Sequence, residues 1–171
     1  HKRFSGMYYT PQMIVNGKYQ TLGHNRANAF NAINRSLKLP AKVAVSVRQV
    51  KKEDGTIAVN ACTLGEVEHA ALCVALVEHG IKRRITGGEN KGRVLSMDNV
   101  VLEFNCVELA GPTGHEFTFK LKFAPGEKGR NLGAVAFVQR TDNLDVLGAQ
   151  ATRIQLQSVE ESNKEPSHNF Q

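Results

Sequence analysis

The chain has 171 residues, of which 41% are hydrophobic and 22% are charged, and it carries a formal net charge of +6 with a pI near 9.4. This composition is ordinary for globular proteins and is enough for one good-sized domain or two small ones. No run approaches the roughly 20 apolar residues that a membrane-spanning helix needs, so a membrane span is not expected. No leader peptide is visible, and the sequence does not give a compartment.

The first predicted elements are two short strands, at about residues 12–16 and 18–22, followed by a helix. Asn16-Gly17 joins the strands and is the strongest short hairpin signal, because both central residues of a type I′ turn need a positive φ. Asn25 is the preferred helix cap, since its side chain can accept an orphan backbone N–H group. The helix is predicted from apolar residues that recur at helical spacing, namely Ala27, Phe30, Ile33 and Leu37.

After Pro40 the helical spacing disappears, and strand-like runs follow one another with turn signals between them. About seven short strands over roughly 115 residues are typical of an antiparallel β-sandwich. The polar and aperiodic residues 158–171 predict a disordered tail. The predicted strands cover residues 42–50, 56–64, 69–79, 99–109, 115–123, 134–140 and 145–156.

The predicted organisation therefore has three parts. Residues 1–39 form a strand–turn–strand–helix unit, residues 41–157 form the β-sandwich, and residues 158–171 form the tail. A hairpin with one helix cannot bury enough apolar surface to be stable alone. It either packs on the sandwich or belongs with a half-domain that is missing, and the sequence leaves both alternatives open.

The three cysteines, Cys62, Cys73 and Cys106, are odd in number and widely spaced, which is not a disulfide framework. Cys73 lies in the apolar run AALCVALV, and we interpret it as a small buried hydrophobic residue. A pairing of two of the three cysteines across a sheet is the less favoured alternative. The chain has no Cys-x-x-Cys pair.

Basic residues cluster at Lys51-Lys52 and at residues 82–84, so a nucleic acid or an anionic surface is a conceivable partner. Scattered solvated charge is the favoured interpretation. The chain has no Trp, no aromatic-rich basic strand and no finger or helix-turn-helix spacing. A nucleic-acid partner is therefore not expected. The six histidines form no ligand set, and the sequence indicates no metal and no other cofactor.

The segment GGENKGR, residues 87–93, is a glycine-rich loop with basic residues beside it. Glycines let backbone N–H groups approach an anion closely, but the loop lacks the frame of a P-loop. We favour a long inter-strand loop whose polar side chains bond to the backbone, with a groove wall as the alternative. The candidate residues of this loop are Gly88, Glu89, Asn90 and Gly92.

Four short tracts in a fixed order carry a family resemblance. They are Tyr9–Gln12 with Asn16-Gly17, Gly88–Asn90 with Gly92 and Leu95, Ala136–Gln139, and Leu147–Ala149. Together they resemble the thioredoxin-like family known as domain of unknown function 1223, over about residues 4–152. The resemblance implies an α+β chain in which the C-terminal half of a thioredoxin-like fold, the hairpin plus the helix, is followed by an antiparallel β-sandwich.

The resemblance also implies roles for two residues. Pro11 would follow a cis peptide bond, and Thr10 and Pro11 would line a substrate groove. The redox cysteine motif of the family would lie upstream of His1, so this chain is expected to hold no catalytic residue. The function implied is that of a thiol–disulfide redox protein. The alternative is a non-catalytic binding or scaffold module, in which a protein partner or the missing N-terminal half covers exposed strand edges.

Overall fold

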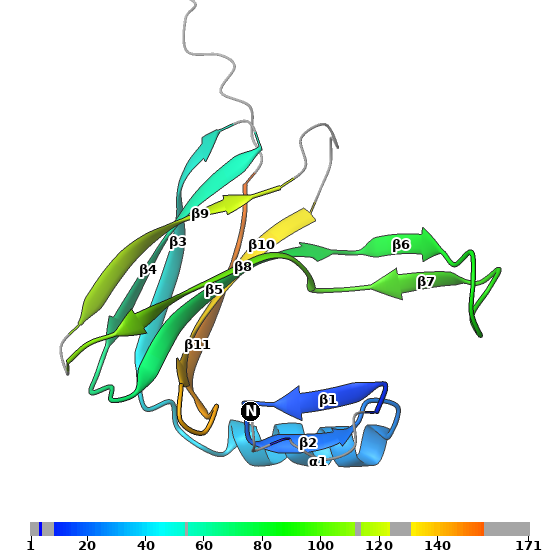
Figure 1. Ribbon diagram of the computed structural model, residues 1–171, viewed down its shortest axis with the longest axis horizontal. Helices are drawn as coiled ribbons and strands as arrows, with labels where there is room; N and C mark the ends of the chain where they lie inside the picture. The colour runs from blue at the N-terminus through cyan, green and yellow to red at the C-terminus, as the bar shows by residue number, and fades with distance from the viewer. Residues whose placement is uncertain (1–3, 5–8, 54, 112–113, 124–130, 156–171) are drawn as a thin grey trace, which may run out of the picture.

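The computed structural model describes residues 4, 9–53, 55–111, 114–123 and 131–155. In this part of the chain, one helix and eleven strands form four antiparallel sheets (Figure 1). The elements in chain order are β1 (Gln12–Val15), β2 (Tyr19–Leu22), α1 (Arg26–Leu37), β3 (Ala44–Glu53), β4 (Thr56–Leu64), β5 (Ala70–His79), β6 (Ile81–Arg84), β7 (Val94–Met97), β8 (Val100–Leu109), β9 (His115–Lys122), β10 (Asn131–Arg140) and β11 (Val146–Arg153).

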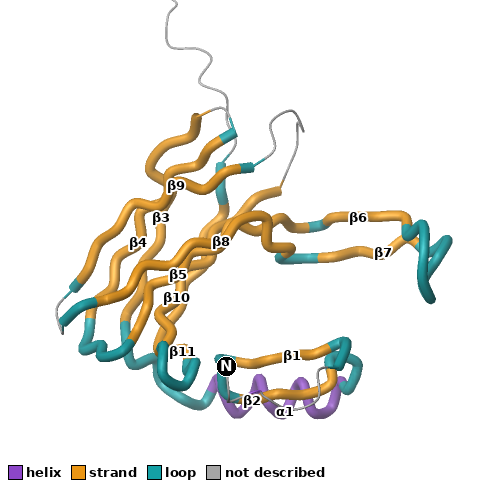
Figure 2. The backbone as a smooth tube through the Cα atoms, in the orientation of Figure 1, coloured by secondary structure: helices purple, strands orange, loops and turns teal. Residues whose placement is uncertain are grey.

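The bulk of the molecule is a pair of facing sheets, with strand orders β11-β10-β5-β8 and β3-β4-β9 (Figures 1 and 2). Side chains alternate along each strand, so every second residue points between the two sheets. In β5 these are Leu72, Val74 and Leu76, each with no exposed surface. The largest fully buried side chains are Ile57, Leu72, Leu76, Leu121, Leu132, Val43, Val59, Val74 and Val138, and they form the core.

The hairpin of β1 and β2 forms as its turn residues predict. Asn16 and Gly17 both have positive φ, 50° and 65°, and Lys18 N–H donates to the Val15 carbonyl at 3.0 Å. The predicted helix cap is confirmed, because Asn28 N–H donates to Asn25 Oδ1 at 3.0 Å. The helix packs against the hairpin rather than against the core of the sandwich (Figure 1).

The turn of the hairpin docks on the loop between β10 and β11. Val146 N–H donates to the Asn16 carbonyl at 3.0 Å. A Cβ at Gly17 would lie 1.6 Å from the Leu144 carbonyl oxygen, so the two backbones approach more closely than any side chain allows. Gly17 therefore serves both the positive φ of the turn and this close approach.

A two-stranded ribbon, β6 with β7, continues from the ends of β5 and β8 and projects away from the sandwich (Figure 1). The predicted inter-strand loop at residues 87–93 joins these two strands, but the strands themselves, at residues 81–84 and 94–97, were not predicted. Each strand has only four residues, and β6 reads IKRR, so neither shows a clear alternation of apolar and polar residues. We call residues 81–97 the β6–β7 arm.

The predicted α+β fold with the C-terminal half of a thioredoxin-like fold is wrong. The described residues are 58% strand with one short helix, and they form several antiparallel sheets without a clear thioredoxin-like α/β arrangement. The strand–turn–strand–helix pattern is local, and β1 and β2 pair only with each other among the described strands. The predicted tail, residues 158–171, lies outside the described residues. Within the part that is described, no helix is long and apolar enough to cross a membrane.

Candidate functional site

The strands β5, β8 and β10 carry apolar side chains on the side of the sheet that faces away from the core. Their register places Phe137 and Cys106 opposite Cys73, and Val135 and Phe104 opposite Ala75. Directly paired residues of antiparallel strands share one face. We call this surface the outer face, and its residues are Cys73, Ala75, Val77, Phe104, Cys106, Val135 and Phe137.

A disulfide joins Cys73 of β5 to Cys106 of β8 across the outer face, with the two Cα atoms 4.1 Å apart. The predicted burial of Cys73 is confirmed, since it is 3% exposed, but the pairing across a sheet, which was the less favoured alternative, is what the structure has. The two cysteines are direct partners in the β5–β8 register, where opposite side chains come closest. The tertiary fold sets the register of β5 against β8. The separation of 33 residues between the two cysteines in the sequence therefore did not indicate the disulfide. Cys62 remains a free thiol.

Two aromatic rings flank the disulfide. Phe104 and Phe137 stack with ring centroids 6.0 Å apart and an interplanar angle of 26°. On the central strand β5 the side chains of this face are shielded from solvent, and Cys73 is only 3% exposed. On the edge strand β8, by contrast, Phe104 is 52% exposed. Around the disulfide the outer face is therefore apolar, it is open to solvent along β8, and it becomes polar where Glu108 and Gln139 lie opposite Ala71.

An apolar cavity of about 390 Å³ continues the outer face toward the hairpin. Val135 and Phe137 belong to both the cavity and the outer face, and Ile14 of β1 lies on the hairpin side of the cavity. The cavity is lined by Phe4, Ile14, Asn16, Gly17, Val135, Phe137, Gln139, Leu144, Val146 and Ala149.

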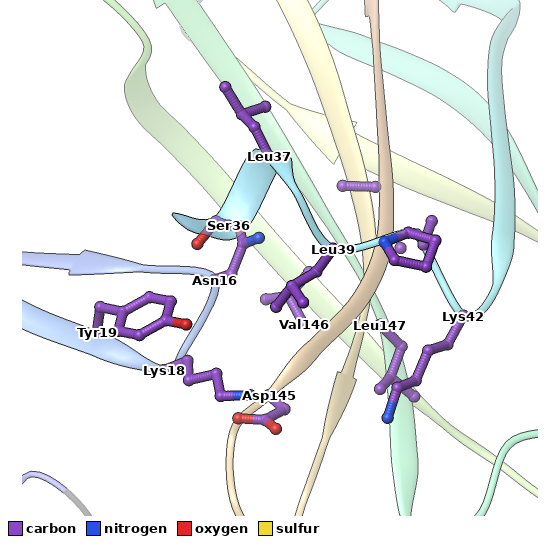
Figure 3. A pocket seen from close by; sticks show the side chains of 14 residues that line it. Asn16, Lys18, Tyr19, Ser36, Leu37, Leu39, Lys42, Asp145, Val146 and Leu147 are labelled. Atoms are coloured by element: carbon purple, nitrogen blue, oxygen red, sulfur yellow. The ribbon is translucent and has the colours of Figure 1, made fainter. Parts of the chain in front are cut away.

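A second cavity, of about 350 Å³, lies on the other side of the docked turn, and we call it the junction cavity (Figure 3). Asn16, Tyr19 and Ser36 line it from the hairpin and helix, and Val146 and Leu147 line it from β11. The remaining lining residues are Lys18, Leu37, Leu39, Pro40, Ala41, Lys42, Asp145, Gly148 and Ala149.

The loop that carries Asp145 is fixed by an ion pair at its start. Arg140 donates to Asp142 through Nη2 at 2.7 Å and through Nε at 2.9 Å. This bidentate hydrogen bond from Arg140 lowers the pKa of Asp142 to about 2 and raises the pKa of Arg140. The pair is at the surface, so it orients the turn more than it stabilises the fold.

Thr10 and Pro11 lie at the start of the hairpin, and the peptide bond between them is cis. Both residues are exposed, and neither lines the apolar cavity or the junction cavity. The Pro11 carbonyl accepts from Gly23 N–H at 2.7 Å, which closes the open end of the hairpin. Their assignment to a substrate groove stays a prediction.

The GGENKGR loop forms the tip of the β6–β7 arm. Gly88 and Gly92 have positive φ, 72° and 84°, and Lys91 N–H donates to the Gly88 carbonyl at 3.0 Å. Asn90 Oδ1 accepts from Arg93 Nη1 at 2.8 Å, and Glu89 is exposed. The structure does not bring Gly88, Glu89, Asn90 or Gly92 together with Thr10 and Pro11, and their role in a groove wall is not tested.

The β6–β7 arm is strongly basic. It carries five basic residues and one acidic residue, Glu89, which gives a net charge of +4, and all six are exposed. Arg83 pairs with Leu95 on one face of the ribbon, whereas Lys82 and Arg84 lie on the other face, because side chains alternate along a strand. Both faces of the arm are therefore positively charged. The basic residues are Lys82, Arg83, Arg84, Lys91 and Arg93.

Among the described residues, no group of three or more His, Cys, Asp or Glu side chains could hold a metal ion. The outer face and the junction cavity were both missed by sequence reasoning. Ala32 and Ser36 are the two buried residues of the helix and lie four positions apart on one side of it, but the predicted apolar stripe included neither of them.

Comparisons with known proteins point to one family. A family model described as "Protein of unknown function (DUF1223)" matches residues 1–139. No curated protein matches the chain. None of the matches shows a relationship to thioredoxin-like proteins.

Solved structures also match the chain, among them the following two. The crystal structure of protein AGR_C_4864 from Agrobacterium tumefaciens has 20% identity and a TM-score of 0.54, over 92% of this chain and 67% of that one. At this identity the likeness shows the fold alone. The X-ray structure of the Northeast Structural Genomics Consortium target SoR45 has 9% identity and a TM-score of 0.26, over 75% of this chain and 99% of that one, which is too slight to support an argument.

Proposed function

This chain belongs to the DUF1223 family of proteins of unknown function, and we propose that it is a non-catalytic binding module that holds an extended apolar segment of a protein partner on its outer face. The observation that carries the proposal is the outer face itself. It is apolar from β8 to β10, it continues into the apolar cavity, and it is open at Phe104.

A solvated antiparallel sheet normally alternates apolar residues on the core side with polar residues on the water side. In β5 the alternation fails, because Cys73, Ala75 and Val77 on the outer face are as apolar as Leu72 and Leu76 on the inner face. Cys73, Ala75 and Val77 are themselves buried, so the apolar surface of this face that solvent reaches lies on β8 at Phe104, and exposed apolar surface of this kind marks an interaction site. Full burial of a Phe side chain such as Phe104 by a partner would contribute about 1.5–3 kcal/mol.

The β6–β7 arm supports a particular chemistry for the partner. It extends from β5 and β8 (Figure 1), the same strands that carry the outer face. Both of its faces carry basic residues. Complementary charge speeds association and suppresses partners of like charge. The partner segment that fits is therefore apolar where it covers Phe104 and Phe137 and acidic where it passes the arm.

The test is the binding of a short synthetic peptide that alternates Phe or Val with Glu, measured by fluorescence anisotropy. Phe104→Ala is expected to weaken binding about tenfold or more, because aromatic side chains that a partner buries carry much of the affinity of an interface. Leu64→Ala is the matched control, since Leu64 is also apolar and is 70% exposed, but lies at the end of β4 in the other sheet. Equal affinity of the two variants for the peptide, or no binding by the unmodified protein, would contradict the proposal.

A second candidate function is thiol–disulfide exchange, with a redox cysteine motif ahead of His1. The observation that favours it is the exposure of Cys106, since a thiolate reaches a disulfide only through an accessible sulfur. Attack at Cys106 Sγ would form a mixed disulfide there and release Cys73 as the thiolate. Incubation with reduced glutathione followed by mass spectrometry tests this step. Glutathione on Cys106 would support it, and an intact Cys73–Cys106 bond would count against it.

A further inference from the structure

The junction cavity contains a buried polar group that the proposed binding of a peptide on the outer face does not use. Ser36 is 6% exposed, and its Oγ atom has no hydrogen-bond partner among the described residues. Buried hydroxyl groups are nearly always hydrogen-bonded, because the loss of water must be compensated. Ser36 lines the cavity, so a molecule in the cavity is the natural partner for this hydroxyl.

Other polar groups lie around the same cavity. Tyr19 supplies a phenolic hydroxyl and Asn16 an amide, and both come from the hairpin side together with Ser36 (Figure 3). Hydroxyl and amide groups can each donate a hydrogen bond to an oxygen of a ligand. These three groups therefore define a polar end of the cavity.

The charged residues of the cavity favour an anion. Lys18 and Lys42 contribute two positive charges and Asp145 one negative charge, which leaves a net charge of +1. The side chain of Lys18 extends toward Asp145 (Figure 3). The positive charge of Lys18 therefore offsets the negative charge of Asp145 within the cavity.

The opposite side of the cavity is apolar. Leu39 and Pro40 follow the end of α1, and Val146 and Leu147 begin β11, and all four side chains line the cavity. Ligand pockets are commonly about 300–1,000 Å³ in volume and combine an apolar wall with a few placed polar groups. The volume of about 350 Å³ fits a small molecule rather than a protein segment.

We propose that the junction cavity binds a small amphiphilic carboxylate. The carboxylate accepts a hydrogen bond from the Ser36 hydroxyl and is attracted by the net positive charge that Lys18, Lys42 and Asp145 leave in the cavity, and the hydrocarbon part packs on Leu39 and Val146. The site is distinct from the outer face. It stands or falls independently of the proposed binding of a protein segment.

Calorimetric titration of the full chain with hexanoate tests this proposal, with hexylamine as the matched cationic probe of the same length. Hexanoate is expected to bind and hexylamine is not. Ser36→Ala is expected to weaken hexanoate binding about tenfold, since a hydrogen bond to a charged group is stronger than one between neutral groups. Ser46→Ala is the control, because Ser46 is exposed on β3 away from the cavity, and it is expected to leave binding unchanged.

Two further measurements make the test decisive. Lys18→Met keeps the hydroxyl but removes the charge, and it is expected to weaken hexanoate binding without changing the response to hexylamine. In the absence of hexanoate, Ser36→Ala is expected to unfold at the same or a higher temperature, because it deletes an unpaired buried hydroxyl. Equal binding of hexanoate by Ser36→Ala, equal binding of the two probes, no binding of hexanoate, or a clearly lower unfolding temperature of Ser36→Ala would each overturn the proposal.

Discussion

Both faces of the four-stranded sheet carry apolar side chains, but they differ in what covers them. On the inner face, Leu72 and Leu76 lie against the β3-β4-β9 sheet and have no exposed surface. On the outer face, the hairpin covers only the end near the apolar cavity, and Phe104 stays exposed. Apolar character alone therefore does not define a core. An apolar face that remains open is better explained as a binding surface than as a part of the fold.

The largest expected effect is a difference in the free energy of unfolding between a substitution on the inner face and one on the outer face. Leu76→Ala on the inner face should lower the free energy of unfolding by about 2–5 kcal/mol, since it removes a fully buried side chain and leaves a cavity. Phe104→Ala on the outer face should lower it by less than about 1 kcal/mol, because that side chain is half exposed. Urea unfolding of both variants measures the difference. A similar loss for the two variants would show that the outer face belongs to the core.

The next effect concerns the disulfide on the outer face. Replacing Cys73 and Cys106 together by Ala should lower the free energy of unfolding by about 2–4 kcal/mol, because the bond closes a loop with a sequence separation of 33. Thermal unfolding with and without a reductant measures it, and the reductant should have no effect on the double variant. Cys62→Ala is the control, since Cys62 is free. If reduction does not change the stability of the unmodified chain, the disulfide does not stabilise this face.

A smaller effect tests how the hairpin is held beside the outer face. Gly17→Ala should cost about 1–3 kcal/mol in backbone strain at a positive φ, and its Cβ would collide with the Leu144 carbonyl oxygen. The hairpin should then detach while the sandwich stays folded. Faster amide hydrogen exchange at Val146, with unchanged exchange at Leu76, is the expected signature. Gly87→Ala is the matched control because nothing lies within 4 Å of its added Cβ, and a Gly17→Ala variant that exchanges like this control would contradict the docking.

The smallest effect is at the exposed Arg140–Asp142 pair. The pKa of Asp142 is lowered from 3.8 to about 2 by the hydrogen bonds from Arg140, so its contribution to stability is present above pH 3.8 and is lost as the pH falls toward 2. The side chain is at the surface, so this contribution is small. An NMR titration of the Asp142 carboxyl group should show a midpoint near pH 2. In Arg140→Gln the midpoint should return toward 3.8, and a value near 3.8 in the unmodified chain would contradict the pairing.

The local elements could be predicted from the sequence because their signals are local. Asn16-Gly17 specifies a hairpin turn through two positive φ angles, and Asn25 specifies a helix start through its own side chain. The strand predicted at residues 56–64 is β4 with the same bounds. In each case the residues that form the element also carry its signal.

The non-local features could not be predicted. The register of β5 against β8 decides that Cys73 meets Cys106, and no spacing along the chain encodes it. The strand–turn–strand–helix pattern was extended by resemblance to half of a thioredoxin-like fold, and the observed sheets contradict that extension. The candidate residues Thr10 and Pro11 line neither cavity. Ser36 does line the junction cavity, but the burial of its hydroxyl without a hydrogen-bond partner is visible only in three dimensions.

The most direct test of the central claim is a map of where the acidic, Phe- and Val-containing peptide binds. Backbone amide NMR spectra of the unmodified chain, recorded with increasing peptide, locate the contact residue by residue. The account predicts that the shifts gather on β8 and β10 around Phe104, Cys106 and Phe137 and extend to the β6–β7 arm. Shifts confined to the β3-β4-β9 sheet, or no shifts at all, would contradict a binding function for the outer face.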